Sequence, residues 1–341
     1  MGIHMKNKLI ISYQDIISPK NLYEAWQEFL PGKKGKEDVS EFTLNLSNNI
    51  FNLHSDLKNK TYTHGPYKAF NINDPKPRSI HKAIVMDRLL HHAVYRILYP
   101  YFDRLFIYDS YSCRNFKGTH RALERFGDFG RKVSKNHKRT CWVLKCDIRK
   151  CFASIDQVII LNIVRKYITD RDILWLLENI VASFQNTSSQ KGLPLGNLTS
   201  QLLVNIYLNE LDQWMKHKMK VKYYIRYADD FVVLDTDKDK LLELVPKIAD
   251  FLNEELKLQL HPDKLFIKTL ASGVDFLGWV HFSNHRVLRT STKKKMFRNL
   301  KEKEGEKREN SVASYLGMLK WGNGWKLAKL LPKVGNLCYT L

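Results

Sequence analysis

The sequence predicts an α+β fold, in which antiparallel strands pack against amphipathic helices. β-forming apolar residues flank a tight turn at Tyr227-Ala228-Asp229-Asp230, which indicates a hairpin over residues 223–234. A second apolar run, residues 142–148, predicts another strand that carries Asp147 near its end. Helices are indicated by apolar residues at helical spacing, over residues 83–102 and again after residue 197.

The elements before the predicted strand at 142–148 follow from local patterns. Residues 67–72 alternate in polarity and predict a strand, and residues 74–77 predict a turn. On the predicted helix 83–102, His91 and His92 are expected to be structural or surface residues rather than ligands.

Later elements are less regular. Residues 241–256 predict a helix, in which Pro246 is expected to start or kink a segment. Residues 276–280 predict the edge of a strand pair. Aromatic and glycine-rich residues after 285 fit a small helical unit.

The composition favours a polynucleotide partner. Among 341 residues, 56 Lys and Arg stand against 35 Asp and Glu, so the formal net charge is +21. Such a surplus attracts a phosphate backbone and makes binding sensitive to salt. Basic residues gather at 33–36, 131–139 and 293–298. A merely solvated basic surface would not explain the 44% hydrophobic content, which suffices for two or three subdomains.

No feature of the sequence points to a membrane or to secretion. No apolar stretch approaches the roughly 18 residues that span a bilayer, and the N-terminus lacks a signal core. The five cysteines form no Cys-x-x-Cys pair, so reduced thiols in a cytoplasmic protein are expected. Residues 1–4 are equally consistent with an expression scar and with a native beginning.

The adjacent carboxylates of Asp229 and Asp230 indicate a metal site. Two like charges at the tip of a buried hairpin are costly unless a cation neutralises them. If Asp147 lies beside Asp229, the cluster could hold two Mg²⁺ ions about 4 Å apart, the arrangement used in phosphoryl transfer. Beyond the turn at 74–77, Lys76 and Arg78 could reach a triphosphate, Arg by bidentate contact and Lys as a point charge.

Several motifs in order resemble the reverse transcriptases. Tyr-Ala-Asp-Asp and the preceding Asp-x-x-x-x-Phe segment look like that family's palm, and further matching segments run from about residue 67 to 290. These are Lys76-Pro77-Arg78-Ser79-Ile80, Asp87-Arg88, the stretches 110–120 and 192–201, Leu260-His261-Pro262-Asp263-Lys264, and Phe276-Leu277-Gly278-Trp279.

The resemblance implies a right-hand polymerase with fingers, a palm of antiparallel sheet plus helices, and a small helical thumb. Residues 1–135 would form the N-terminal region and fingers, 136–285 the palm and 286–341 the thumb. The partners would be an RNA template, a DNA or RNA primer and deoxynucleoside triphosphates. Too few residues follow 285 for an endonuclease or ribonuclease H domain, which disfavours a full group II intron maturase.

The resemblance also assigns roles to residues. The catalytic residues and ligands of two Mg²⁺ ions would be Asp147, Asp229 and Asp230. Nucleotide-binding residues would be Lys76, Arg78, Phe152, Leu195, Gly196 and Lys264. The template or primer would contact Arg114, Ser200, Gln201 and Gly278. Phe152, five residues after Asp147, would pack under the sugar and exclude a ribose 2′-hydroxyl.

A finer similarity is to reverse transcriptases of diversity-generating retroelements, which copy RNA with errors at adenines. Where most relatives have Gln-Gly and Ser-Pro, this chain has Leu195-Gly196 and Ser200-Gln201. An apolar Leu195 cannot hydrogen-bond the incoming nucleotide and so cannot reward correct geometry. That subgroup also implies a basic, oligomeric accessory protein. Alternatives are a defence-associated, retron-like or group II intron-like reverse transcriptase and, in another class, a non-catalytic RNA-binding protein.

Overall fold

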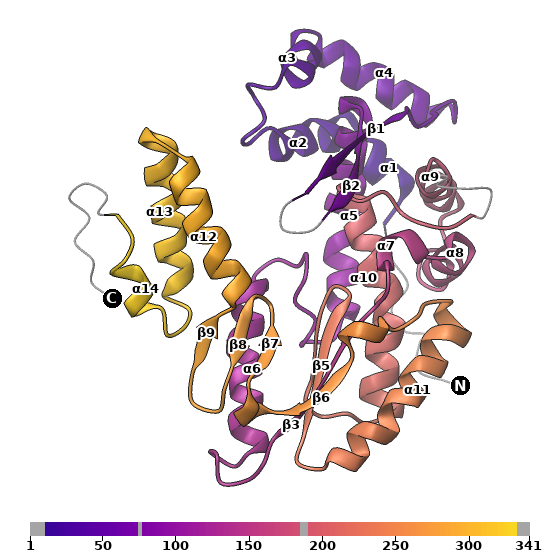
Figure 1. Ribbon diagram of the computed structural model, residues 1–341. Helices are drawn as coiled ribbons and strands as arrows, with labels where there is room; N and C mark the ends of the chain where they lie inside the picture. The colour runs from indigo at the N-terminus through magenta and orange to yellow at the C-terminus, as the bar shows by residue number, and fades with distance from the viewer. Residues whose placement is uncertain (1–10, 74–76, 185–189, 333–341) are drawn as a thin grey trace.

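The computed structural model describes residues 11–73, 77–184 and 190–332. Figure 1 shows an N-terminal group of helices at one end of the molecule, a central sheet with its helices, and a C-terminal pair of helices standing beside them. The predicted α+β class is therefore confirmed.

Four short helices open the N-terminal part: α1 (Tyr13–Ile17), α2 (Pro19–Phe29), α3 (Glu37–Leu44) and α4 (Leu46–Lys58). Ser12 forms a capping box with Asp15 at α1, and Ser18 caps α2, which begins with a proline. The buried side chains of Trp26 and Phe29 anchor α2 in the main core, where it packs against α5 (Val85–Leu105).

A two-stranded hairpin projects next to these helices. It consists of β1 (Tyr67–Ile72) and β2 (Arg78–Ala83), paired from Tyr67 with Ala83 to Ile72 with Arg78. The predicted strand 67–72 is confirmed by β1. The turn predicted at 74–77 falls mostly on residues 74–76, which lie outside the described residues, as does Lys76.

The long helix predicted at 83–102 is present as α5 and extends three residues further. It contains Pro100 without ending there. His91 is buried, and its Nε2 lies 3.2 Å from Nε2 of His64, so its predicted structural role is confirmed.

The central sheet has four antiparallel strands in the order β4-β5-β3-β6. They are β3 (Trp142–Asp147), β4 (Tyr224–Tyr227), β5 (Asp230–Asp235) and β6 (Phe266–Thr269). Because successive side chains on a strand point to opposite faces, Leu144 and Phe231 join the main core, whereas Val143 and Val232 join a second core. Both faces of the sheet are thus covered.

The main core lies between the sheet and a set of helices: α7 (Cys151–Ser154), α8 (Gln157–Arg165), α9 (Arg171–Ala182), α10 (Leu198–Gln213) with its π-helical extension η1 (Trp214–Lys218), and α11 (Lys238–Leu256). The prediction for Pro246 is wrong in one respect. The helix starts earlier, where the Asp237 side chain accepts from Asp239 and Lys240 backbone N–H groups, and it runs through Pro246.

The second core packs α6 (Thr119–Val133) on the opposite sheet face, through Ala122, Phe126 and Phe129. The predicted boundary at residue 135 assigns this helix to the fingers, whereas its buried face packs against the central sheet. The 3₁₀ turns η2 (Pro262–Lys264) and η3 (Leu270–Ser272) flank β6.

A small sheet joins this region to the C-terminal helices. Its strands are β7 (Val274–Phe276), β8 (Trp279–His281) and β9 (Arg286–Leu288), all antiparallel. Leu277 and Gly278 form the β7–β8 turn with φ of 50° and 86°, a pair of values typical of tight hairpins. The predicted thumb at 286–341 thus begins with a strand of this sheet and becomes helical at residue 290.

The C-terminal helices are α12 (Thr290–Glu302), α13 (Gly305–Leu319) and α14 (Trp325–Ala328). Their core includes Met296, Leu300, Leu316 and Leu319, and Trp279 of β8 joins it. Across the described ranges, no helix is both long and apolar enough to cross a membrane. The four cysteines in those ranges, Cys113, Cys141, Cys146 and Cys151, are free thiols.

Candidate active site

Three carboxylates from distant parts of the chain meet at one end of the central sheet. Asp147, the last residue of β3, is the register partner of Asp230, the first residue of β5. The backbone N–H of Ile148 donates to the Asp229 carbonyl at 3.0 Å, which ties the end of β3 to the turn. The structure therefore brings Asp147 beside Asp229 and Asp230, as the sequence predicts.

The charges of these carboxylates oppose one another. Burial raises the pKa of Asp229, and the neighbouring Asp147 raises it further. Burial also raises the pKa of Asp230 to about 7, while Lys145 opposes the shift. Oδ1 of Asp230 is buried and has no hydrogen-bond partner. A cation near this turn would offset that repulsion.

Two lysines neutralise part of this charge. Lys264 Nζ donates to Asp147 Oδ1 at 2.6 Å, and Lys145 Nζ lies 3.3 Å from Asp230 Oδ2. Lys264 was predicted to bind the nucleotide, whereas here its ammonium contacts the Asp147 carboxylate directly. Lys145, two residues before Asp147 on the same strand face, was missed by the sequence analysis. Its position in a buried strand was the signal, because a buried lysine requires an acidic partner.

The donor set fits a hard divalent cation. Carboxylate oxygens are the ligands that such ions prefer, and Mg²⁺ takes only one or two protein carboxylates together with substrate phosphates. In the described part of the chain, no group of three or more His, Cys, Asp or Glu residues is arranged to enclose a metal by itself. Asp147 and Asp229 would then hold the ion together with a bound triphosphate.

A buried ion pair supports the turn from below. Arg226 of β4 and Asp212 of α10 are both fully buried and form two hydrogen bonds, of 2.8 and 2.6 Å. Tyr224 Oη donates to the same Asp212 carboxylate at 2.8 Å.

The Arg226 guanidinium also reaches the turn itself. It donates to the carbonyl of Ala228 at 3.2 Å and to Ser110 Oγ at 3.1 Å. Ala228 has a φ of 54°, a left-handed conformation that costs a residue with a Cβ about 1 kcal/mol. Arg226 therefore holds the backbone conformation that places Asp229. The sequence analysis missed it, although an Arg inside a buried strand indicates a paired charge.

Residues 192–201 resemble the family's segment that braces the template and nucleotide, and this bracing segment lies against the β1–β2 hairpin. The carbonyl of Leu195 accepts from the His81 N–H of β2 at 3.0 Å, and Asn197 Nδ2 donates to the His81 carbonyl at 3.3 Å. Gly196 has a φ of 112°, which only glycine adopts without strain. Leu195 and Gly196 therefore lie beside the strand that begins at Arg78.

Arg78, the first residue of β2, is exposed, and its charge lowers the pKa of Asp229 against the larger effect of burial. Phe152, on α7, is half-buried, and its carbonyl accepts from the Leu193 N–H at 2.8 Å. Arg78 thus acts on the Asp229 carboxylate, and Phe152 lies beside the bracing segment.

Two predicted template or primer contacts need correction. Ser200 is only 2% exposed, so the protein itself covers the side chain that was predicted to contact nucleic acid. Arg114 pairs with Asp103 at 2.6 Å and donates to the carbonyls of Ile107 and Ser110, so it anchors its own loop.

The two other predicted contacts remain accessible. Gln201 is half-buried in the first turn of α10. A Cβ added to Gly278 would meet no atom within 4 Å, so open space lies above the β7–β8 turn.

Comparison with known proteins defines the class. The sequence model of the reverse transcriptase (RNA-dependent DNA polymerase) family matches residues 72–281, more than half of the chain. The chain therefore belongs to the reverse transcriptase family. Telomerase from Candida tropicalis, in its apo structure, superposes with a TM-score of 0.55 at 12% identity, over 79% of this chain and 60% of that one. This likeness confirms the predicted right-hand polymerase fold.

Individual relatives are distant. The group II intron-encoded protein LtrA of Lactococcus lactis subsp. cremoris is 23% identical over 357 residues, which cover 83% of this chain and 58% of LtrA. Protein YkfC of Escherichia coli (strain K12) is 26% identical over 282 residues, which cover 71% of this chain and 70% of YkfC. The chain thus spans a little over half the length of LtrA.

Arg226→Ala tests the support beneath the turn. It would leave the Asp212 carboxylate buried without its cation, so we expect the free energy of unfolding to fall by about 3–5 kcal/mol. Urea denaturation would measure it. The control is Arg165→Ala, which removes an ion pair whose side chains are 45% and 42% exposed and should cost at most about 1 kcal/mol. Equal losses in the two variants would contradict the role given to Arg226.

Proposed function

We propose that this chain is an RNA-directed DNA polymerase that extends a DNA or RNA primer with deoxynucleoside triphosphates on an RNA template. The observation that carries the proposal is the meeting of Asp147, Asp229 and Asp230 at one end of the central sheet, in a chain of the reverse transcriptase family. Membership of that family implies dependence on a divalent metal ion, and the proposal is two Mg²⁺ ions. Bound there, they would supply positive charge to the primer 3′-hydroxyl and the triphosphate.

The chain's own residues prepare the site in four ways. Asp147 and Asp229 present carboxylates to the metal ions, and Arg226 fixes the turn from which Asp229 projects. Lys145 pairs with Asp230, which leaves Asp230 an assisting role. Lys264 lies on Asp147 and can turn from that carboxylate to a phosphate oxygen when a nucleotide binds, since a lysine ammonium has three donors on a flexible stem.

Asp229→Ala tests the polymerase itself. Loss of a metal ligand should lower magnesium-dependent incorporation of deoxynucleotides by at least about a thousandfold. Primer extension on an RNA template measures it. Asp239→Ala, which removes an exposed carboxylate at the start of α11, should leave the rate unchanged. Undiminished extension by Asp229→Ala, or none by the wild type, would favour the alternative of a non-catalytic RNA-binding protein.

Phe152 is proposed to exclude ribonucleotides. Its ring is half-buried on α7, five residues after Asp147, and its backbone is bonded to the bracing segment at Leu193. In Phe152→Ala we expect incorporation of ribonucleotides relative to deoxynucleotides to rise roughly tenfold or more, because the space for a 2′-hydroxyl opens. Competition between the two substrates in primer extension measures the ratio. Phe51→Ala, at a 60% exposed site on α4, is the control, and an unchanged ratio in Phe152→Ala would remove the gate.

The biological setting we propose is error-prone copying in a diversity-generating retroelement. It rests on Leu195-Gly196 and Ser200-Gln201, the positions where this chain departs from most of its superfamily. A basic accessory protein belongs to the same proposal, and a cytoplasmic location stays a prediction. The intron-encoded relatives favour a second candidate, a group II intron-like reverse transcriptase. A template repeat, a variable repeat and an accessory gene beside the coding sequence would distinguish the first setting.

Leu195→Gln tests the link to infidelity. The added amide can hydrogen-bond the incoming nucleotide and reward correct pairing, so errors opposite template adenines should fall several-fold. Sequencing of the products of one defined RNA template measures the error rate. Leu242→Gln, at a 49% exposed site on α11, controls for the change in composition. An unaltered adenine error rate in Leu195→Gln would show that this residue does not set fidelity.

A further inference from the structure

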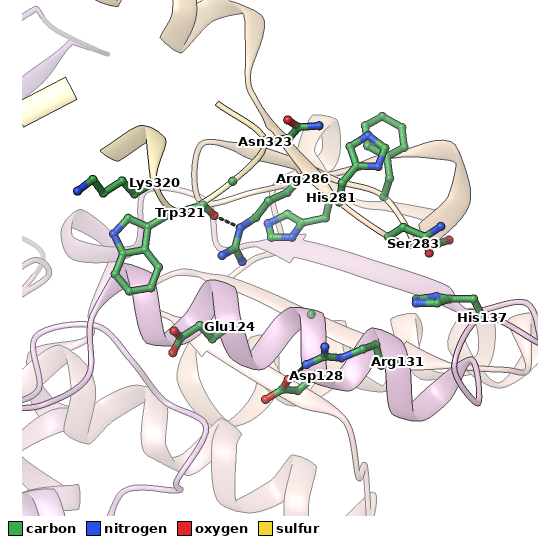
Figure 2. Close-up of a pocket in the computed structure, with 15 residues that line it drawn as sticks. Glu124, Asp128, Arg131, His137, His281, Ser283, Arg286, Lys320, Trp321 and Asn323 are labelled. Carbon is green, nitrogen blue, oxygen red and sulfur yellow. Dashed lines mark hydrogen bonds and ion pairs between the residues drawn. The ribbon is translucent and has the colours of Figure 1, made fainter. Parts of the chain in front are cut away.

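A cavity of about 630 Å³ lies at the junction of α6, the β8–β9 turn and the turn between α13 and α14. Figure 2 shows Asp128 and Arg131 on the α6 wall and Arg286, Trp321 and Lys320 on the wall opposite. Its walls thus come from three regions far apart in sequence. None of the three catalytic carboxylates lines it.

The cavity lies away from the site of polymerisation. At the N-terminal end of α6, Thr119 Oγ1 donates to Tyr227 Oη beside the catalytic turn, at 3.1 Å. At 1.5 Å per residue, Asp128 lies about 13 Å further along the same helix. The β8–β9 turn is likewise at the opposite end of β8 from Gly278. The part of the cavity that Asp128 and the β8–β9 turn line is thus separated from the Asp229-Asp230 turn.

One buried group in the wall lacks a partner. His281 is 3% exposed, and its Nε2 has no hydrogen bond. The other ring nitrogen bonds the Phe276 backbone, and burial lowers the pKa of His281 to about 3, so the ring is neutral. Nε2 is then a buried acceptor without a donor, in a residue that lines the cavity. A buried polar atom without a partner is costly, and a ligand's N–H or O–H would remove that cost.

A donor and aromatic rings lie close to this acceptor. Arg286 donates Nε to the Trp321 carbonyl, which leaves its terminal N–H groups free to face a ligand (Figure 2). Each nucleobase carries a donor and an acceptor side by side on an edge, so the His281–Arg286 pair matches a base. The Trp321 ring is stacked on His120, with centroids 4.1 Å apart and an interplanar angle of 15°. This stack covers one face of the Trp321 ring, and the other face could stack on a base, as aromatic side chains do in single-strand binding sites.

The surrounding charge suits phosphates. Asp128 is paired with Arg131, and Glu124 acts on Arg286, so the acidic groups of the wall are already balanced. Lys320 is exposed at the rim. The basic stretch 131–139 starts at the cavity wall and is mostly exposed along its length. A strand with one base in the cavity could run its phosphates along this stretch.

We propose that this cavity binds a base of a single-stranded RNA segment, with Lys320 and residues 131–139 on its phosphates. The segment would be held outside the polymerisation site, so the enzyme would carry its RNA at two places. Binding at the cavity does not depend on catalysis. The ribose 2′-hydroxyl is a further donor that could satisfy His281.

The test compares two double variants that change charge equally, in the full chain. Arg131→Glu with Lys320→Glu alters the cavity rim, whereas Lys240→Glu with Lys247→Glu alters α11, where the side chains are 70% and 53% exposed. Fluorescence anisotropy with a labelled 15-nucleotide single-stranded RNA, without magnesium or nucleotides, measures binding. We expect the rim variant to bind roughly tenfold more weakly than the α11 variant and its salt dependence to be shallower.

His281→Phe is the second variant, because it keeps the ring volume and removes the acceptor; we expect binding about threefold weaker. Circular dichroism checks that each variant is folded. Primer extension on a short primer–template with a recessed primer end should be unchanged in all of them. Failure of the polymerase proposal would instead appear as no extension even by the wild type. Three results would overturn the RNA site. The two double variants could lose RNA affinity equally, or the rim variant and His281→Phe could both bind RNA as well as the wild type. An acidic peptide could also compete with the labelled RNA as well as unlabelled RNA does.

Discussion

The turn at Asp229 and Asp230 depends on one buried ion pair. Arg226 and Asp212 are both fully shielded from water, and the pair joins the β4 edge of the sheet to α10 beneath it. The same guanidinium holds the Ala228 carbonyl and Ser110. A buried pair of this kind adds little net stability, yet removal of one partner is strongly destabilising, so its value lies in fixing one arrangement. That arrangement sets the direction of Asp229.

The site stores negative charge and balances it with lysines. Asp147, Asp229 and Asp230 repel one another in a partly buried turn, and Lys264 and Lys145 each contact one of them. Metal ions and substrate would replace part of that compensation in the working enzyme. The two lysines therefore differ in role. Lys264 contacts Asp147, a proposed metal ligand, and would have to move away when a metal ion binds there. Lys145 would stay paired with Asp230.

The chain is a member of the reverse transcriptase family, and its relatives include intron-encoded proteins at 22–26% identity. At such distances the shared fold does not fix the biological setting. The biological setting must therefore be inferred from the residues proposed to surround the nucleotide. Among them, Leu195 bonds β2 through its backbone carbonyl, so its apolar side chain takes no part in that contact. The cavity beside α6 adds a second surface by which members of this family could differ in the RNA they retain.

Much of the fold and the candidate carboxylates could be predicted from the sequence, because they belong to local patterns. Alternating and helical periodicities identified β1, α5 and α10, and the Asp-Asp turn between apolar strands identified the site. The prediction that a segment could start at Pro246 was wrong, since the helix begins after the Asp237 cap and continues through Pro246. Only tertiary structure decided that Arg114 and Ser200 turn inward, that Arg226 meets Asp212, and that α6 joins the sheet. Each depends on which distant surfaces bury one another, and local sequence does not encode that.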